Sequence, residues 1–232
     1  MDKSVKLLCV IPWNSPFLWA KSVSGFLNLL FPPTMSIGWY LASGWCSARR
    51  KTVGVEMAIQ SEADFIWFLD ADQVVEQETF LKLWDHVIAG RNPIGTMQPC
   101  RGYFPQFEGS KPFQPMCWDE HGKPFTPEKL QTVMYGSLNC FIIATDTFKR
   151  LERPWFQERF DETTMARQSS LDQHFTKKLW DAGMPLWVDP SIRPKHMDAM
   201  ELDWSFQNRF DDLMPCKKQP LSSDSVKLEV LS

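Results

Sequence analysis

The sequence is most informative at residues 65–72, which read Phe65-Ile66-Trp67-Phe68-Leu69-Asp70-Ala71-Asp72. The five apolar residues predict a buried strand, and this strand stops on two carboxylates spaced one residue apart. Side chains at positions i and i+2 of an extended segment point to the same side, so Asp70 and Asp72 can face one crevice. A hard divalent cation that bridges them to phosphate oxygens would offset their mutual repulsion. The segment therefore indicates a metal–diphosphate site, although either Asp could instead only cap the helix that follows.

Strands and helices alternate on both sides of this segment. The apolar pattern predicts strands over 5–12, 36–43 and 64–69, and helices over 22–30, 47–61 and 76–89. Ser47 is a possible cap of the second helix. Alternation at this spacing is typical of βαβ units, so we expect a single α/β domain with a mostly parallel central sheet and helices on both faces. In such sheets, ligands bind at the carboxyl ends of the strands.

The second half of the chain is less regular. Residues 91–127 are crowded with Pro, Gly and aromatic residues, which predicts a long irregular loop. Beyond it we expect a strand within 133–144, a short helix over 145–151, a helix over 169–182 and a strand over 186–188. The polar residues 216–232 predict a flexible tail, so that the domain covers residues 1–215.

Composition narrows the classes of function. The 232 residues are 44% hydrophobic, as in an ordinary globular protein with a real core. The net charge of −3 gives no basic surface for unspecific nucleic-acid binding. The six cysteines are scattered without a C-x-x-C pair, and no apolar run reaches eighteen residues. We therefore expect reduced thiols, no membrane span and a cytoplasmic protein.

Two arginines stand at the start of the helix predicted over 47–61. Arg49 or Arg50 could hold a phosphate group there by charge-assisted hydrogen bonds. The alternative is that both belong to a solvated basic patch with Lys51.

Two later residues can also be tied to the paired carboxylates. Asp172 lies in the first turn of the helix predicted over 169–182, where it can act as a general base or simply complement the helix dipole. His196 follows a Pro-punctuated loop, and a neutral imidazole beside two carboxylates suits Mn²⁺ or a similar ion. A single His is more often structural, so both interpretations of His196 stay open.

Taken together, these ordered motifs resemble the inverting nucleotide-sugar glycosyltransferases of family 2, particularly the small bacterial and phage-type enzymes. The resemblance covers roughly Val5 to Met197 and depends on these features in order: Ile-Pro-x-Asn at 11–14, Ala-Arg at 48–49, Asp-x-Asp at 70–72, a Gly-containing strand at 136, Pro-Trp-Phe at 154–156, Asp172 and His196.

The resemblance implies a GT-A fold, which is a Rossmann-like nucleotide-binding fold, with a nucleotide-binding half over 1–90 and an acceptor-side half over 91–215. It implies a hexosyltransferase-type enzyme that uses Mn²⁺ or Mg²⁺ and a nucleoside-diphosphate sugar as donor. The acceptor could be a glycan, a lipid-linked sugar, a protein or a modified nucleobase.

For the donor side, the resemblance places Pro12 and Asn14 against the nucleotide and Arg49 near the nucleotide or its diphosphate. Within the Asp70-Ala71-Asp72 turn, Asp70 would contact the ribose or the metal shell and Asp72 would coordinate the metal.

For the reaction itself, the resemblance makes Asp172 the catalytic base and His196 a ligand of the metal or a contact of the diphosphate. Gly136, Trp155 and Phe156 would line the crevice for the sugar and the acceptor.

The sequence also departs from the pattern of this family. Arg50 stands where Asn is frequent, and Leu171 stands before Asp172 where Glu is common. No acidic residue ends the strand predicted over 36–43, so the donor base stays open. Two other classes remain: a phosphatase of the haloacid-dehalogenase type, with the first Asp of the pair as nucleophile, and a non-catalytic module that binds sugar nucleotides.

Overall fold

The computed structural model describes residues 4–13, 18–97, 117–119, 121, 123, 125–160, 167–197 and 201–202. Asn14, most of the loop predicted over 91–127 and the tail predicted over 216–232 lie outside these ranges.

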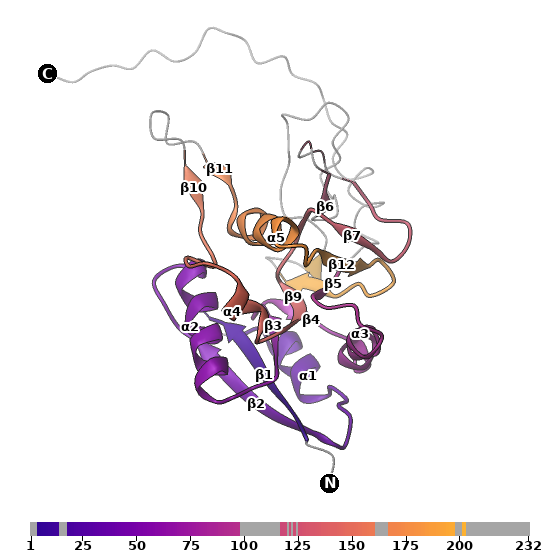
Figure 1. Ribbon diagram of the computed structural model, residues 1–232. Helices are drawn as coiled ribbons and strands as arrows, with labels where there is room; N and C mark the ends of the chain where they lie inside the picture. Colours follow the sequence, from indigo (N-terminus) through magenta and orange to yellow (C-terminus); the bar gives the residue numbers. More distant parts are fainter. Residues whose placement is uncertain are drawn as a thin grey trace, which may run out of the picture.

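A seven-stranded sheet forms the centre of the described chain, in the order β2-β1-β3-β9-β5-β12-β7 (Figure 1). Its strands are β1 (Val5–Pro12), β2 (Met35–Ala42), β3 (Phe65–Leu69), β5 (Ile94–Thr96), β7 (Gln131–Val133), β9 (Cys140–Ala144) and β12 (Leu186–Asp189). Strands β9 and β7 run antiparallel to their neighbours, and the remaining strands share one direction. The sheet is therefore mixed and mostly parallel, which agrees with the prediction in its coarse form.

Helices cover both faces of this sheet, as predicted. Alternate residues of β1 point to opposite faces, because side chains in a strand alternate. Leu8 and Val10 pack with residues of α2 (Ser47–Gln60), α4 (Thr147–Arg150) and α5 (Leu171–Asp181). Leu7 and Cys9 pack on the other face with residues of α1 (Ala20–Leu27) and α3 (Thr79–Ile88). None of the helices in the described ranges is long and apolar enough to cross a membrane.

The apolar residues 133–144 do not form the one strand that their composition predicts. The chain passes instead through the end of β7, then β8 (Tyr135–Gly136), and then β9. Strand β8 pairs outside the main sheet with β6 (Cys117–Trp118), whereas β9 enters the sheet beside β3. The turn between β8 and β9 brings residues 137–139 to the end of β3, where Asp70 N–H donates a hydrogen bond to the Asn139 carbonyl (2.7 Å).

Two small antiparallel sheets flank the same edge. One joins β4 (Gln73–Val74), β13 (Lys195–Met197) and β14 (Glu201–Leu202), and the other joins β10 (Arg159–Phe160) and β11 (Arg167–Ser169). In the first of these, His196 pairs with Gln73, so the pairing carries His196 from the end of the described chain to the residues that follow β3.

Helix ends agree with the sequence in part. Gly90 and Gly183 follow α3 and α5 with φ of 79° and 70°, the left-handed region in which glycine ends helices. Ser47 is not the cap of α2: the capping position is Cys46, which makes no side-chain capping bond. The Ser47 hydroxyl instead accepts a hydrogen bond from Arg50 Nη2 (2.9 Å).

Candidate functional site

A cavity of about 320 Å³ opens where β1 and β3 end and where α2 and α5 begin. Its wall consists of Pro12, Ser47, Arg50, Lys51, Asp70, Ala71, Asp72, Asn139, Glu158, Ser170, Leu171 and Asp172. The sequence predicted a site at this edge of the sheet, and the predicted residues Pro12, Asp70, Ala71, Asp72 and Asp172 meet there.

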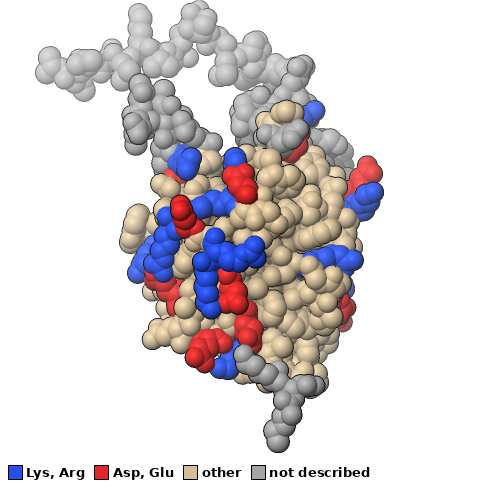
Figure 2. All heavy atoms as spheres, viewed as in Figure 1, with Lys and Arg blue, Asp and Glu red and all other residues tan. Residues whose placement is uncertain are grey.

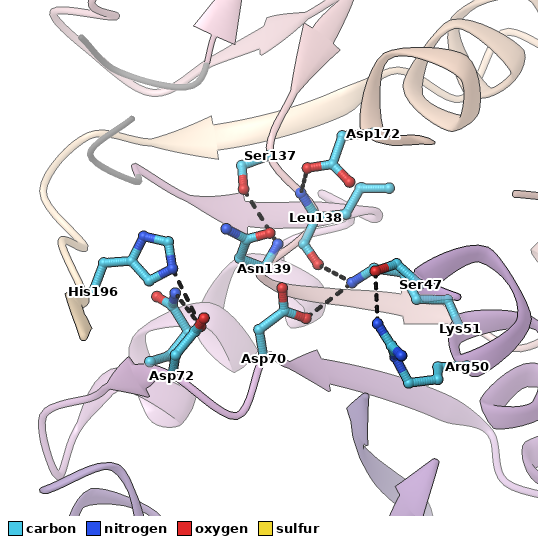
Figure 3. A network of polar contacts seen from close by, with 11 residues as sticks. Ser47, Arg50, Lys51, Asp70, Asp72, Ser137, Leu138, Asn139, Asp172 and His196 are labelled. Carbon is cyan, nitrogen blue, oxygen red and sulfur yellow. Dashed lines mark hydrogen bonds and ion pairs between the residues drawn. The ribbon is translucent and has the colours of Figure 1, made fainter. Parts of the chain in front are cut away.

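Asp70 and Asp72 both line the cavity, but each has its own partner (Figure 3). Asp70 Oδ1 lies 3.1 Å from Lys51 Nζ, and Asp72 Oδ1 lies 3.2 Å from His196 Nε2. The turn that separates them is fixed by the Gln73 N–H, which donates to the Asp70 carbonyl (3.0 Å). The backbone thus directs two acidic groups into one space while tying them to different elements.

Lys51 is the most buried charged group of the wall, with 4% of its side chain exposed. Its ammonium group also donates to the Leu138 carbonyl (2.9 Å), in the turn between β8 and β9. Burial nevertheless raises the pKa of Asp70 to about 6, since the attraction of Lys51 is opposed by the charges of Asp72 and Asp172. Among the described residues of the wall, four side chains carry carboxyl groups (Asp70, Asp72, Glu158 and Asp172) and two are basic (Arg50 and Lys51).

The Asp72–His196 pair is held by the backbone of β13. Met197 N–H donates to the Asp72 carbonyl (2.7 Å), and this bond fixes the strand against the turn after β3. His196 is buried, and its Nδ1 has no hydrogen-bond partner in the part of the chain that the structure describes. No three His, Cys, Asp or Glu side chains among the described residues lie close enough to hold a metal ion together, so the predicted set of Asp70, Asp72 and His196 does not converge as three ligands.

Asp172 is positioned by the start of α5. Ser170 caps this helix through a capping box, in which its hydroxyl accepts from Gln173 N–H and the Gln173 side chain accepts from Ser170 N–H. Asp172 Oδ2 in turn accepts a hydrogen bond from Leu138 N–H (3.2 Å). The carboxylate therefore points from the helix toward the turn that contacts Lys51 and Asp70 (Figure 3).

Of the two arginines at the start of α2, Arg50 lines the cavity and Arg49 does not. Arg49 is half exposed, forms an ion pair with Glu56 (3.5 Å) and lines only an adjoining hollow beside Trp45, which shares Arg50 and two other residues with the cavity. Arg50 lines the cavity and is held by the Gly44 carbonyl (3.0 Å) and the Ser47 hydroxyl. The two side chains diverge because consecutive residues of a helix point about 100° apart.

Gly136 and Trp155 do not lie on the cavity wall. A Cβ at Gly136 would lie 2.8 Å from Leu186 Cδ2, so this glycine allows β8 to approach β12. Trp155 is 4% exposed, and its indole N–H donates to the Phe148 and Leu151 carbonyls. Gly136 therefore serves the packing of β8 against β12. Trp155 belongs to the core, where the Pro-Trp-Phe segment packs against α4 and α5. Phe156, predicted to line the crevice, is buried and borders the hollow beside Trp45 instead.

Six residues of the wall were not predicted as site residues, namely Ser47, Lys51, Asn139, Glu158, Ser170 and Leu171. The position of Lys51 does indicate burial, since it lies four and seven residues before Val55 and Ala58 on the buried stripe of α2. A lysine on such a stripe requires a buried partner. Asn139 and Glu158 lie outside any regular pattern, and we find no comparable signal for them.

Comparisons with known proteins bear on the fold alone. No protein family and no curated protein matches the sequence. Among solved structures, the chain is similar to the crystal structure of A197 from STIV, with a TM-score of 0.55 and 14% identity over 84% of this chain and 86% of that chain. At this identity, the similarity shows a shared mixed α/β architecture.

Proposed function

We propose that the protein is a metal-dependent glycosyltransferase with a GT-A fold, which transfers a sugar from a nucleoside-diphosphate sugar to an acceptor hydroxyl with inversion. The observation that carries the proposal is the meeting of Asp70 and Asp72, at the end of β3, with Asp172, at the start of α5, in one cavity. This arrangement places a candidate metal-binding carboxylate and a candidate general base on different elements around the same space.

The residues present fit a divalent cation. Ions such as Mg²⁺ are held in many enzymes by one or two carboxylates together with substrate phosphates. Asp72 Oδ1 and His196 Nε2 are 3.2 Å apart, close to the ~3.0 Å between neighbouring ligands of an octahedral ion with bonds of about 2.1 Å. Carboxylate oxygens suit both Mn²⁺ and Mg²⁺, and the imidazole of His196 favours Mn²⁺ of the two. When bound, the ion would neutralise charge on the departing diphosphate.

Groups that favour an anion lie beside these ligands. The N-termini of α2 and α5 both border the cavity, and helix N-termini attract phosphate groups through free N–H groups and the helix dipole. Arg50 adds a guanidinium group whose position is fixed by two hydrogen bonds. Together these groups support the binding of a diphosphate between Arg50 and Asp72.

Asp172 is the proposed general base. Its carboxylate takes the proton of the acceptor hydroxyl, whose oxygen forms a bond to the anomeric carbon. The bond from this carbon to the diphosphate oxygen breaks at the same time, and the nucleoside diphosphate leaves with the electron pair. The hydrogen bond from Leu138 N–H to Asp172 Oδ2 fixes the orientation of this carboxylate at the cavity.

The test is a panel of sugar nucleotides with Mn²⁺ or Mg²⁺, scored by release of nucleoside diphosphate with and without candidate acceptors. Asp72→Ala should abolish metal-dependent release, and the exposed Asp181→Asn, on α5 but outside the cavity, should not change it. If no donor binds and Asp72→Ala changes nothing, the proposal fails. Release of inorganic phosphate from phosphomonoesters would show a phosphatase instead, and metal-dependent binding without turnover would show a binding module.

A further inference from the structure

We propose that Lys51 is a positioning residue, which sets the charge around Asp70 and the orientation of Asp172 at the same time. The proposal rests on the proposed function for its effect on turnover, but its effect on cation binding can be measured without any donor.

Lys51 takes part in a ring of interactions at the carboxyl edge of the sheet, and Figure 3 shows its two contacts, with Asp70 and with Leu138. Its ammonium group binds Asp70 Oδ1 at 3.1 Å and the Leu138 carbonyl at 2.9 Å. The Asp70 N–H donates to the carbonyl of Asn139, the residue next to Leu138. The lysine, the end of β3 and the turn before β9 are thereby tied to one another at three points.

This ring reaches Asp172 through a single residue. Leu138 accepts from Lys51 with its carbonyl and donates from its N–H to Asp172 Oδ2 (3.2 Å). A shift of Leu138 therefore moves the proton acceptor on α5. An error of about 1 Å in the placement of a reacting group can slow an enzyme about 10²-fold, so the anchoring of Leu138 by Lys51 matters for the rate.

The contact between Lys51 and Asp70 also makes the two carboxylates of the Asp-x-Asp turn different. Asp70 gives one oxygen to an ammonium group, whereas Asp72 faces the His196 imidazole. Lys51 thus offsets the negative charge of Asp70, and it does so inside the protein, where charges are weakly screened. Removal of the lysine should therefore increase the attraction of the free protein for a cation while it impairs the transfer reaction. A residue that only supported the fold would lower both.

The experiment compares Lys51→Met, Lys51→Arg and the double variant Lys51→Met/Asp70→Asn with wild type, and uses the exposed Lys177→Met as control. Electron paramagnetic resonance measures the Mn²⁺ affinity of the donor-free protein. Thermal unfolding shows whether each variant folds, and steady-state kinetics give kcat and KM separately. We expect Lys51→Met to bind Mn²⁺ about 3- to 30-fold more tightly, since a nearby positive charge is lost. Its kcat should fall about 10- to 100-fold with a smaller change in KM.

The other variants separate charge from position. Lys51→Arg keeps the charge, so its Mn²⁺ affinity should stay within about twofold of wild type while kcat falls. The double variant removes both charges and should bind Mn²⁺ no more tightly than wild type, which keeps the test informative if Lys51→Met does not fold. Unchanged or weaker Mn²⁺ binding by folded Lys51→Met, or tighter binding by the double variant, overturns the proposal. Failure of wild type to turn over any sugar nucleotide counts against the proposed function and leaves the Mn²⁺ comparison intact.

Discussion

The packed faces of the central sheet and its carboxyl edge differ in the kind of side chain that they bury. On the faces, Trp67, Phe68 and Phe141 are fully buried against other apolar side chains. At the edge where β3 ends, Lys51 of α2 and His196 of β13 are almost as buried and yet carry titratable groups. The charged groups on the face shown in Figure 2 are different again, because acidic and basic side chains lie beside one another in solvent.

This contrast indicates that the faces of the sheet stabilise the fold, whereas the carboxyl edge is arranged for binding. Removal of apolar surface from water stabilises the faces, at roughly 25 cal/mol per Å². Burial of ions does not stabilise the edge in the same way, since the cost of desolvation can exceed the gain from pairing. Buried charges that gather at one edge around a cavity are therefore better explained by ligand binding than by folding. Substitutions in the two regions should separate accordingly.

The largest expected effect is on catalysis at the edge. Asp172→Asn keeps the acceptor atom for Leu138 N–H but removes the ability to take a proton. We expect turnover to fall about 10²- to 10⁴-fold. The melting temperature should stay near that of wild type, because the side chain keeps its size and its hydrogen bond. Asp181→Asn on the same helix is the control, and similar turnover by both variants would show that Asp172 is not the base.

On the faces, the largest expected effect is on stability. Phe141→Ala removes a fully buried ring that stacks on Phe68 with centroids 5.0 Å apart. We expect the free energy of unfolding to fall by about 3–5 kcal/mol, because the loss of burial is joined by an unfilled cavity. Urea denaturation measures this loss. The Mn²⁺ affinity of the folded fraction should not change. A selective loss of Mn²⁺ binding would contradict the view that the faces of the sheet affect stability and the edge affects binding.

How much of each region the sequence predicts follows from the same contrast. The apolar run before Asp70 predicted β3 and also the place of the carboxylates, because strand order puts the ends of β1 and β3 side by side. The apolar run over 133–144 predicted one strand, but the chain there is divided between two sheets. Apolar composition does not reveal where the chain leaves one sheet for another. Trp155 was predicted to line the crevice, because an aromatic residue beside Pro suggests an exposed platform, but its ring lies in the core. The nucleotide contact assigned to Asn14 stays a prediction.

A smaller effect is expected where a helix meets the sheet closely. A Cβ at Gly54 in α2 would overlap the Val10 side chain and touch Phe68. Gly54→Ala should therefore destabilise the protein by about 1–3 kcal/mol despite the higher helix propensity of Ala. Gln60→Ala, at the exposed end of α2, is the matched control and should change stability by less than about 0.5 kcal/mol. Equal stability of Gly54→Ala and wild type would mean that α2 can move away from the sheet, and with it Lys51.

The smallest expected effect concerns the pH dependence of Asp70. Because burial raises its pKa to about 6 in the folded protein, the folded state holds this proton more tightly than the unfolded state does. Stability from this group is complete below about pH 4 and is lost as the pH rises through 6. A quarter of the side chain is exposed, so we expect a loss of about 1–2 kcal/mol rather than the ~3 kcal/mol of the full shift.

Asp70→Asn removes this dependence. In metal-free buffer, wild type and Asp70→Asn should have similar free energies of unfolding at pH 4, where position 70 is uncharged in both folded proteins. At pH 7 wild type should lose 1–2 kcal/mol relative to the variant, since only wild type then carries a buried carboxylate. Denaturation series at both pH values measure the difference. The opposite trend, with wild type gaining stability toward pH 7, would mean that Lys51 more than offsets the burial of Asp70, and that this edge is stabilised by its charges rather than weakened by them.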